Sequence, residues 1–266
     1  MVTMQPVLPL VLRRLDDYQS WQITWQGTAL LIDPWLTEHP IRGSFDRVHG
    51  PGYATWDDLA QQDIAAVLLC TGVNDHARPE SLSLLPDIPV LGPRGAAAVA
   101  RRAGCQQVSA VRVGEQHTFQ CRQGGTLTVT VTRTGFPLGL IAVGYVIEAR
   151  DSMGAVRGRL WLDPHLPRAR QARAARPIDV ALLPCHGVMA VVMPVTLGPR
   201  GTARVARAAQ SASVVPTATD PRRDMSAWQR VVYRVGGGVG ATAEQLEPLA
   251  SIQVLTAGEE LLITHT

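Results

Sequence analysis

The clearest pattern along the chain is a series of short apolar runs, each followed by a polar segment. Residues 65–70 are apolar at every position, which is typical of a strand buried on both faces of a sheet. A polar loop follows, with Asp75 and His76 side by side, and Pro79 then favours the start of a helix. Because ligands usually bind at strand ends in α/β sheets, this loop is the first candidate site.

Similar runs predict further strands and helices. A hairpin is expected from residues 21–25 and 29–32, which are joined through Gly27. Further strands are expected at residues 88–91, 108–113, 117–121, 127–132, 142–149, 159–162, 180–183 and 213–216. Helices are expected at residues 96–103 and 202–210, and Gly104 ends the first of them. After Asp220 the pattern weakens until a last strand at residues 260–264.

Residues 37–57 interrupt this pattern with an irregular stretch rich in Gly, Pro and aromatic residues. A loop of this length is usually a lid or an interaction surface. His39 and His49 lie in it and could reach a pocket, although surface histidines are the commoner case.

Three segments of the first part of the chain recur in the same order in the second. Residues 31–35 match 161–165, residues 67–70 match 181–184, and the Leu-Gly-Pro-Arg-Gly of residues 91–95 returns at 197–201. Such self-similarity indicates two similar halves, about residues 1–140 and 141–266, within a single domain. Each half supplies strands and then helices, so the predicted fold is an α/β protein with a four-layer αββα sandwich.

Composition and charge narrow the range of partners. The formal net charge of 266 residues is only +3, which gives no general attraction to nucleic acid. The densest basic run comprises Arg157, Arg159, Arg168, Arg170, Arg173 and Arg176. It lacks the interleaved aromatic residues that stack on bases, so a solvated basic face is expected and a nucleic-acid partner is not.

Cysteine usage and hydropathy indicate a reduced, cytoplasmic protein. Cys70, Cys105, Cys121 and Cys185 form no closely spaced pair, so buried thiols are expected rather than a disulfide framework. The N-terminal apolar run carries its charges after the run, unlike a signal peptide, and no stretch is long enough to cross a membrane. The sequence leaves the oligomeric state open.

Several of these stretches resemble the metallo-β-lactamase fold superfamily. The resemblance is to its lactonase-like branch, and within that branch to a group of plant-plastid and cyanobacterial proteins. It is carried by residues 30–36, 67–79, 89–104, 162–165 and 198–216. The resemblance implies the αββα sandwich and a metal-dependent hydrolase.

The main metal motif of that superfamily, H-x-H-x-D-H, is only partly present. In the window 72–76 neither leading histidine is found, and Gly72 and Asn74 stand in their places. The next family histidine would fall near Gly135 and Phe136, and the late one at Ala218. The resemblance therefore implies that the first metal site is lost, while Asp75, His76 and Asp163 of the second remain, with His165 or His186 as stand-ins.

Two functions follow and both stay open. In the first, one divalent ion (Zn, Mn or Mg) held by Asp75, His76 and Asp163 activates water against a small ester, lactone or phosphoester. Asn74 would then donate a hydrogen bond to the developing oxyanion. In the second, Asp75 caps the helix near Pro79, no metal is bound, and the protein is a non-catalytic binding or assembly scaffold.

Three further residues are candidates for the pocket. Asp33 follows the strand of residues 29–32 and is expected to tie its loop to backbone amides. Cys185 and His186 are adjacent and could form a thiolate–imidazole pair, although buried packing is the usual role of such a cysteine. A nuclease role in RNA processing would need a metal pair and an added nucleic-acid domain, and the sequence has neither.

Overall fold

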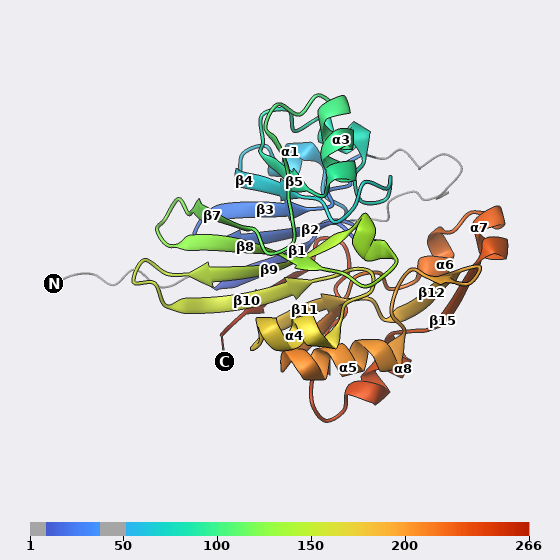
Figure 1. Ribbon diagram of the computed structural model, residues 1–266. Helices are drawn as coiled ribbons and strands as arrows, with labels where there is room; N and C mark the ends of the chain where they lie inside the picture. The colour runs from blue at the N-terminus through green and yellow to red at the C-terminus, as the bar shows by residue number, and fades with distance from the viewer. Residues whose placement is uncertain (1–8, 38–51, 266) are drawn as a thin grey trace.

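Two twisted sheets lie face to face in the computed structural model, with helices on both outer sides (Figure 1). The structure describes residues 9–37 and 52–265. Within these residues each sheet has seven strands. The predicted αββα sandwich is thereby confirmed.

The first sheet has the order β17-β1-β2-β3-β4-β5-β6. Its strands are β17 (Glu260–Ile263), β1 (Leu10–Arg14), β2 (Trp21–Trp25), β3 (Thr28–Ile32), β4 (Asp63–Leu68), β5 (Val90–Gly92) and β6 (Val108–Ala110). The helices α1 (Trp56–Leu59), α2 (Pro79–Leu82) and α3 (Arg94–Arg102) belong to the same part of the chain. Figure 1 shows α1 and α3 covering its outer face.

The second sheet has the order β16-β14-β11-β10-β9-β8-β7. Its strands are β7 (Gln116–Gln120), β8 (Thr126–Arg133), β9 (Val143–Arg150), β10 (Val156–Leu162), β11 (Val180–Leu183), β14 (Ser213–Pro216) and β16 (Ser251–Ile252). Its outer face is covered by α4 (Ala169–Ala175), α5 (Pro199–Ala209) and α8 (Val239–Leu246).

A smaller sheet of β13 (Met193–Pro194), β12 (His186–Ala190) and β15 (Tyr233–Gly237) projects to the right in Figure 1. The short helices α6 (Pro221–Asp224) and α7 (Ala227–Val232) pack beside it, and the 3-10 turn η1 (Leu138–Leu140) precedes β9. Val188, Met225 and Val235 give this sheet a small apolar core of its own.

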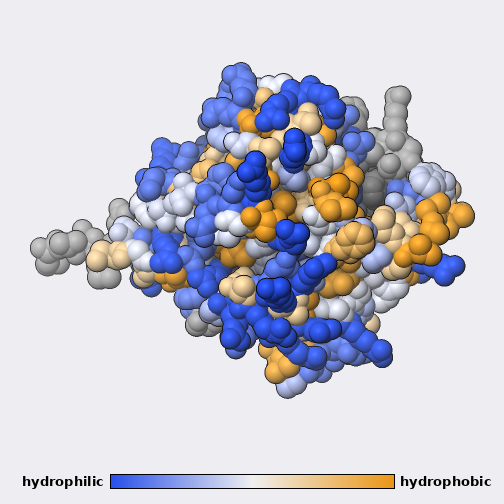
Figure 2. Space-filling view, in the orientation of Figure 1, coloured by the Kyte–Doolittle hydropathy of each residue, from blue (hydrophilic) through white to orange (hydrophobic). Residues whose placement is uncertain are grey.

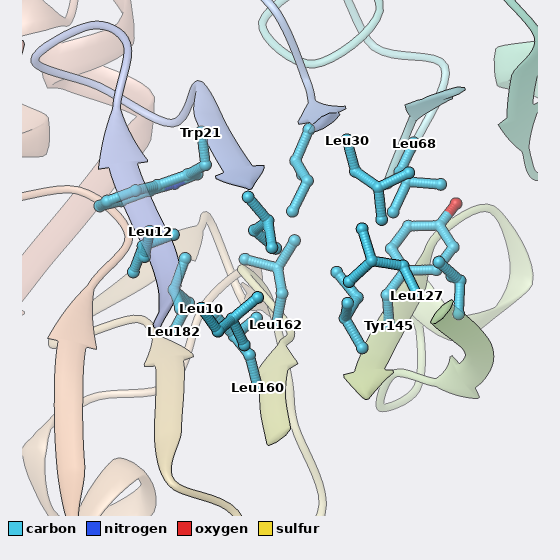
Figure 3. Packing of buried hydrophobic residues seen from close by; sticks show 14 of the residues in the cluster. Leu10, Leu12, Trp21, Leu30, Leu68, Leu127, Tyr145, Leu160, Leu162 and Leu182 are labelled. Atoms are coloured by element: carbon cyan, nitrogen blue, oxygen red, sulfur yellow. The ribbon is translucent and has the colours of Figure 1, made fainter. Parts of the chain in front are cut away.

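The core between the large sheets explains why the strands are apolar at consecutive positions. In β3, Leu30 and Ile32 point into the inter-sheet core, whereas Leu31 packs under the helices on the other side. Both faces are therefore buried, as the sequence pattern of these strands predicts. Figure 3 shows Leu30 and Leu68 of the first sheet opposite Leu127 and Tyr145 of the second.

Tyr145 links the two sheets through a polar contact inside this core. Its hydroxyl donates a hydrogen bond of 2.7 Å to the Leu69 carbonyl, just after β4. Replacing Tyr145 by phenylalanine should lower the free energy of unfolding by about 1–2 kcal/mol, because the buried carbonyl loses its partner. Urea unfolding measures the change. The matched control Tyr233→Phe, at a half-buried position of β15, should change stability by less than about 0.5 kcal/mol.

Parallel strands place the candidate residues at one edge of each sheet. The pairs β3–β4 and β10–β11 are parallel, and β14 runs parallel to β11. Asp33 follows β3, Asp163 follows β10, and Cys185 comes shortly after β11. The carboxyl ends of these strands therefore carry the polar residues, as expected for an α/β sheet.

Several details differ from the sequence-based expectation. The sheets change between β6 and β7, not near residue 140, and β17 returns to the first sheet, so the two predicted halves do not coincide with the sheets. The strand β1 and the elements between Asp220 and β16 were not predicted.

The basic run contains α4, on which Arg170 and Arg173 are exposed. Most of the predicted loop at residues 37–57, with His39 and His49, lies outside the described residues.

Two further observations concern the whole chain. The four cysteines are buried and unbridged. No helix among the described residues is long and apolar enough to cross a membrane.

Candidate metal centre

The pairing of Asp33 with His76 organises the site. Asp33 leaves β3 with a positive φ of 45°, a conformation that is uncommon for a residue other than glycine. One carboxylate oxygen accepts a hydrogen bond of 2.8 Å from the Cys70 amide, and the other lies 2.7 Å from Nδ1 of His76. Both side chains are buried. The imidazole is therefore held in one orientation by a carboxylate behind it, as is common for metal-binding histidines.

The other ring nitrogen of His76 faces Asp75. Nε2 lies 3.8 Å from Oδ2 of Asp75, which also accepts a hydrogen bond of 3.3 Å from the Tyr18 hydroxyl. Burial works against protonation of His76, but the charges of Asp33 and Asp75 and the hydrogen bond to Asp33 outweigh it and raise the pKa of the imidazole to about 9. The site thus has an excess of negative charge that attracts a cation, here a proton.

Asp163 is a buried carboxylate that is only half satisfied. Its Oδ1 accepts hydrogen bonds from the Thr134 hydroxyl at 2.9 Å and from the His165 amide at 3.1 Å. Its Oδ2 is buried and has no hydrogen-bond partner among the described residues. Burial raises the pKa of Asp163 to about 7, although the two hydrogen bonds oppose the shift. A buried, unpartnered carboxylate oxygen requires an explanation, and an ion is one.

His165 connects Asp163 with His76. Its amide is bonded to Asp163, and its ring stacks on that of His76 with the ring centres 4.9 Å apart. Burial, and then the positive charge of His76, lower the pKa of His165 well below its usual value. Nδ1 of His165 is buried without a hydrogen-bond partner in the described part of the chain. A neutral imidazole with a free nitrogen is the form that binds metals.

One group of three ligand-type side chains converges in the described part of the chain. The possible ligand atoms of Asp33, Cys70 and His76 lie within 4.8 Å of one another. However, burial and the nearby charge of Asp33 raise the pKa of the Cys70 thiol well above its usual range, and both Asp33 oxygens already have partners. This trio fits a hydrogen-bond network better than a metal site. No three of Asp75, His76, Asp163 and His165 form such a close group in the described residues. What they offer is two unpartnered buried atoms, Asp163 Oδ2 and His165 Nδ1, with the His165 ring stacked on that of His76.

A cavity of about 620 Å³ opens beside these residues. Six of the predicted site residues line this cavity, namely Asn74, Asp75, His76, His165, Cys185 and His186. Asn74 is exposed. Asp33 and Asp163 are almost completely buried and are not among the residues that line the cavity. The two aspartates adjoin this region through their hydrogen bonds with His76 and with the His165 amide.

Two sequence-based interpretations are wrong. Asp75 does not cap the helix near Pro79, because α2 has Arg78 at its N-cap and no side-chain cap bond. Counting back from Asp75 and His76 also places the two leading histidines of the H-x-H-x-D-H motif at Thr71 and Val73, not at Gly72 and Asn74. Neither position carries a histidine, so the absence of the first site's ligands is unchanged.

The burial of Cys185 favours packing over a nucleophilic pair with His186. The Cys185 thiol is buried, and burial raises its pKa to about 11 despite an opposing hydrogen bond with Thr242. A thiol of this kind is inert at neutral pH. His186 is half-buried at the start of β12, and burial lowers the pKa of its imidazole. Its Nδ1 has no hydrogen-bond partner among the described residues.

Tyr18 and Thr134 are site residues that the sequence did not reveal. Tyr18 lies in the turn between β1 and β2, and Thr134 follows β8. Thr134 also accepts a hydrogen bond of 3.1 Å from the Leu166 amide, so it fixes the turn that carries Asp163. Neither residue has a motif around it that would have identified it.

Comparison with known proteins settles the family. The profile of the Beta-lactamase superfamily domain matches residues 16–218, a range that includes every candidate residue above. The chain belongs to the beta-lactamase superfamily. The superfamily inferred from the sequence is thereby confirmed, and the branch within it stays a prediction. A search of curated protein sequences gives no match.

Solved structures with the same fold are distant in sequence. The diiron β-hydroxylase CmlA from Streptomyces venezuelae has a TM-score of 0.67 and 16% identity, covering 97% of this chain and 55% of its own. The chain thus spans about half the length of CmlA. An isothiocyanate hydrolase from Delia radicum gut bacteria has a TM-score of 0.64 and 16% identity, covering 96% and 99%. A possible metal-dependent hydrolase from Veillonella parvula has a TM-score of 0.63 and 16% identity, covering 96% and 100%. These similarities establish the fold alone.

Proposed function

We propose that this protein is a metal-dependent hydrolase with a single divalent ion held by Asp75, His76 and Asp163, and with His165 as a fourth ligand. The observation that carries the proposal is the pair of unpartnered buried atoms, Asp163 Oδ2 and His165 Nδ1, next to an imidazole already oriented by Asp33. Leaving two buried polar atoms unsatisfied costs about 1–3 kcal/mol each, and a bound cation removes that cost.

The donor set favours an ion that accepts both oxygen and nitrogen. Two carboxylates and two imidazoles suit Zn²⁺ or Mn²⁺, whereas Mg²⁺ prefers an all-oxygen environment. A divalent ion at this position supplies Lewis acidity toward a substrate oxygen and lowers the pKa of water. The substrate class is a small ester, lactone or phosphoester.

The protein's own residues prepare and support that chemistry. Asp33 fixes the ring of His76 through Nδ1, so that Nε2 faces Asp75. Thr134 holds Oδ1 of Asp163 and leaves Oδ2 available. Asn74 is exposed at the cavity, where its side-chain amide can donate a hydrogen bond to a substrate oxygen that gains negative charge.

A non-catalytic role as a binding scaffold is the second candidate. It is favoured by the residues at the other metal-ligand positions of the superfamily motif, where Thr71, Val73 and Ala218 replace histidines. In that case the ion pairs of His76 with Asp33 and with Asp75 would only stabilise the fold.

Metal content distinguishes the two candidates. Protein purified without added metal, then dialysed against Mn²⁺ or Zn²⁺ and desalted, should retain about one equivalent of metal by elemental analysis. Binding should also raise the unfolding temperature, because a ligand that binds only the folded state stabilises it. Retention below roughly a tenth of an equivalent at a site of this donor set, with no thermal shift for either ion, would sink the hydrolase proposal and leave the scaffold.

A further inference from the structure

The densest basic run of the sequence is divided by the fold. Arg157 forms an ion pair of 2.6 Å with Asp151, and Arg159 pairs with Glu148. The other four arginines lie on α4 or at its two ends, namely Arg168, Arg170, Arg173 and Arg176. None of these four has an ion pair within the described residues. Figure 2 shows hydrophilic residues where Figure 1 places α4. Their positive charge is therefore available to an anion.

A second cavity, of about 650 Å³, lies between α4 and the outer side of β8 and β9. Four arginines line it, namely Arg133, Arg159, Arg168 and Arg170. The described part of its lining carries one carboxylate, that of Glu148, and Arg150 and Arg159 both form ion pairs with it. Three guanidinium groups of the lining thus have no carboxylate partner among the described residues, which makes the cavity suited to an anionic group.

The cavity also offers neutral polar groups. Thr128 and Thr130 are half-buried on the outer side of β8, because alternate residues of this strand face the inter-sheet core. The Thr130 hydroxyl accepts a hydrogen bond of 3.2 Å from Gln116, which leaves its own proton to be donated. On α4, Oε1 of Gln171 is buried and has no hydrogen-bond partner in the described part of the chain. A buried acceptor without a donor costs stability, and a hydroxyl group of a ligand would supply the donor.

We propose that this cavity binds a phosphorylated sugar or polyol. The phosphate group lies among the guanidinium groups of Arg133, Arg168 and Arg170, which match phosphate oxygens with paired N–H donors. A hydroxyl group of the same ligand donates a hydrogen bond to Oε1 of Gln171 and accepts one from Thr130. An anion without hydroxyl groups leaves Gln171 unpartnered, and an uncharged sugar leaves the arginines unpartnered, so the ligand carries both.

This site is separate from the proposed metal centre. The cavity shares no lining residue with the one beside His76 and His165. Binding there requires no metal ion, because every group that holds the ligand belongs to the chain. Failure of the hydrolase proposal therefore leaves the sugar phosphate site standing, and failure of the sugar phosphate site leaves the hydrolase standing.

Calorimetric titration with three probes tests the class of ligand. The protein is first freed of metal with a chelator, which is then removed, so that phosphate cannot bind through a metal ion. At about pH 8, where a phosphate ester is a dianion, glucose 6-phosphate should bind about 3- to 10-fold more tightly than inorganic phosphate, because it adds neutral hydrogen bonds. Glucose should show no binding at the same concentrations. Equal affinities for the two phosphates, or binding of neither, would overturn the proposal.

Two variants on one helix locate the phosphate group. Arg170→Gln removes a guanidinium group from the cavity and should weaken glucose 6-phosphate binding roughly tenfold or more, since a charge-assisted contact is lost. Arg173→Gln removes the same charge from an exposed position of α4 that does not line the cavity. It should change the affinity by less than about twofold. Equal weakening by both variants would mean that anions are attracted only by the general charge of a solvated basic face, and the proposal would be wrong.

A third variant locates the hydroxyl group. Gln171→Met should reduce the affinity for glucose 6-phosphate about 3- to 10-fold, to that for inorganic phosphate, and leave inorganic phosphate binding unchanged. Because Oε1 has no partner in the free protein, its removal should not lower the unfolding temperature, so lost binding would not reflect lost folding. If Gln171→Met weakened both ligands alike, Gln171 would not bind a sugar hydroxyl, and the assignment of the ligand as a sugar phosphate would fail.

Discussion

Replacing Asp33 by asparagine is expected to weaken Mn²⁺ binding by about 10- to 100-fold, although Asp33 is not itself a proposed ligand. The carboxylate lies 2.7 Å from Nδ1 of His76 and directs Nε2 toward Asp75. An asparagine can present its amide nitrogen to Nδ1, which favours the other tautomer and removes a negative charge behind the ring. Both changes make Nε2 a poorer ligand. Hydrolytic activity should fall in parallel when metal is limiting and recover partly at high Mn²⁺ concentration.

The chain contains a second aspartate–histidine pair that serves as a control. Asp179 Oδ2 lies 2.9 Å from Nδ1 of His265, and it also accepts a hydrogen bond from the Arg159 amide. Asp179→Asn should therefore lower stability without changing Mn²⁺ affinity, as measured by calorimetric titration. If Asp33→Asn likewise lowered stability but left the Mn²⁺ affinity unchanged, His76 would not be a ligand.

The sandwich could be predicted because its strands have a simple sequence pattern. Strands such as β3 and β11 are buried on both faces and are therefore apolar at consecutive positions. The helices α3 and α5 begin within the same Leu-Gly-Pro-Arg-Gly segment. Local composition and a repeat were thus sufficient to place most elements of the two large sheets.

The small sheet could not be predicted, because its strands lack such a sequence pattern. Its strands β12 and β15 are glycine-containing and largely half-buried or exposed, so they have neither a continuous apolar run nor a clear alternation. Their pairing joins residues such as Val188 and Val235 that lie far apart in the chain. Such strands are stabilised by tertiary contacts, which local propensity does not report.

The candidate site was predictable where it follows a motif and not where it depends on distant contacts. Asp75, His76 and Asp163 follow buried strands and match a known metal motif. The roles of Tyr18 and Thr134 depend on side-chain hydrogen bonds to Asp75 and Asp163, across 57 and 29 positions of the chain. Asp33 was expected to bond a backbone amide, but its pairing with His76 across 43 positions was not foreseen.

Replacing Asp163 by asparagine is expected to have opposite effects on metal binding and on the stability of the metal-free protein. Asp163 is a proposed ligand, so its loss should reduce Mn²⁺ affinity by more than the roughly 100-fold expected at most for a residue that only orients a ligand. Without metal, however, the variant should be more stable than the original chain at pH 8, by about 1–3 kcal/mol. The gain arises because asparagine keeps the contacts of Oδ1 with Thr134 and the His165 amide and removes a buried charge.

The pH dependence of that gain identifies its cause. Burial raises the pKa of Asp163 from 3.8 to about 7, so between these values the unfolded chain has lost a proton that the folded chain keeps. Stability of the metal-free protein therefore falls with rising pH across this range. The advantage of Asp163→Asn should be small near pH 4, grow through pH 5–7 and be complete above pH 7. Urea unfolding in the presence of a chelator measures this difference.

A constant advantage at every pH would mean that the carboxylate is charged without penalty in the folded protein, and that Oδ2 has a partner even without metal. An advantage that grows with pH and disappears on adding Mn²⁺ would mean that this buried carboxylate reduces stability until a cation occupies the site.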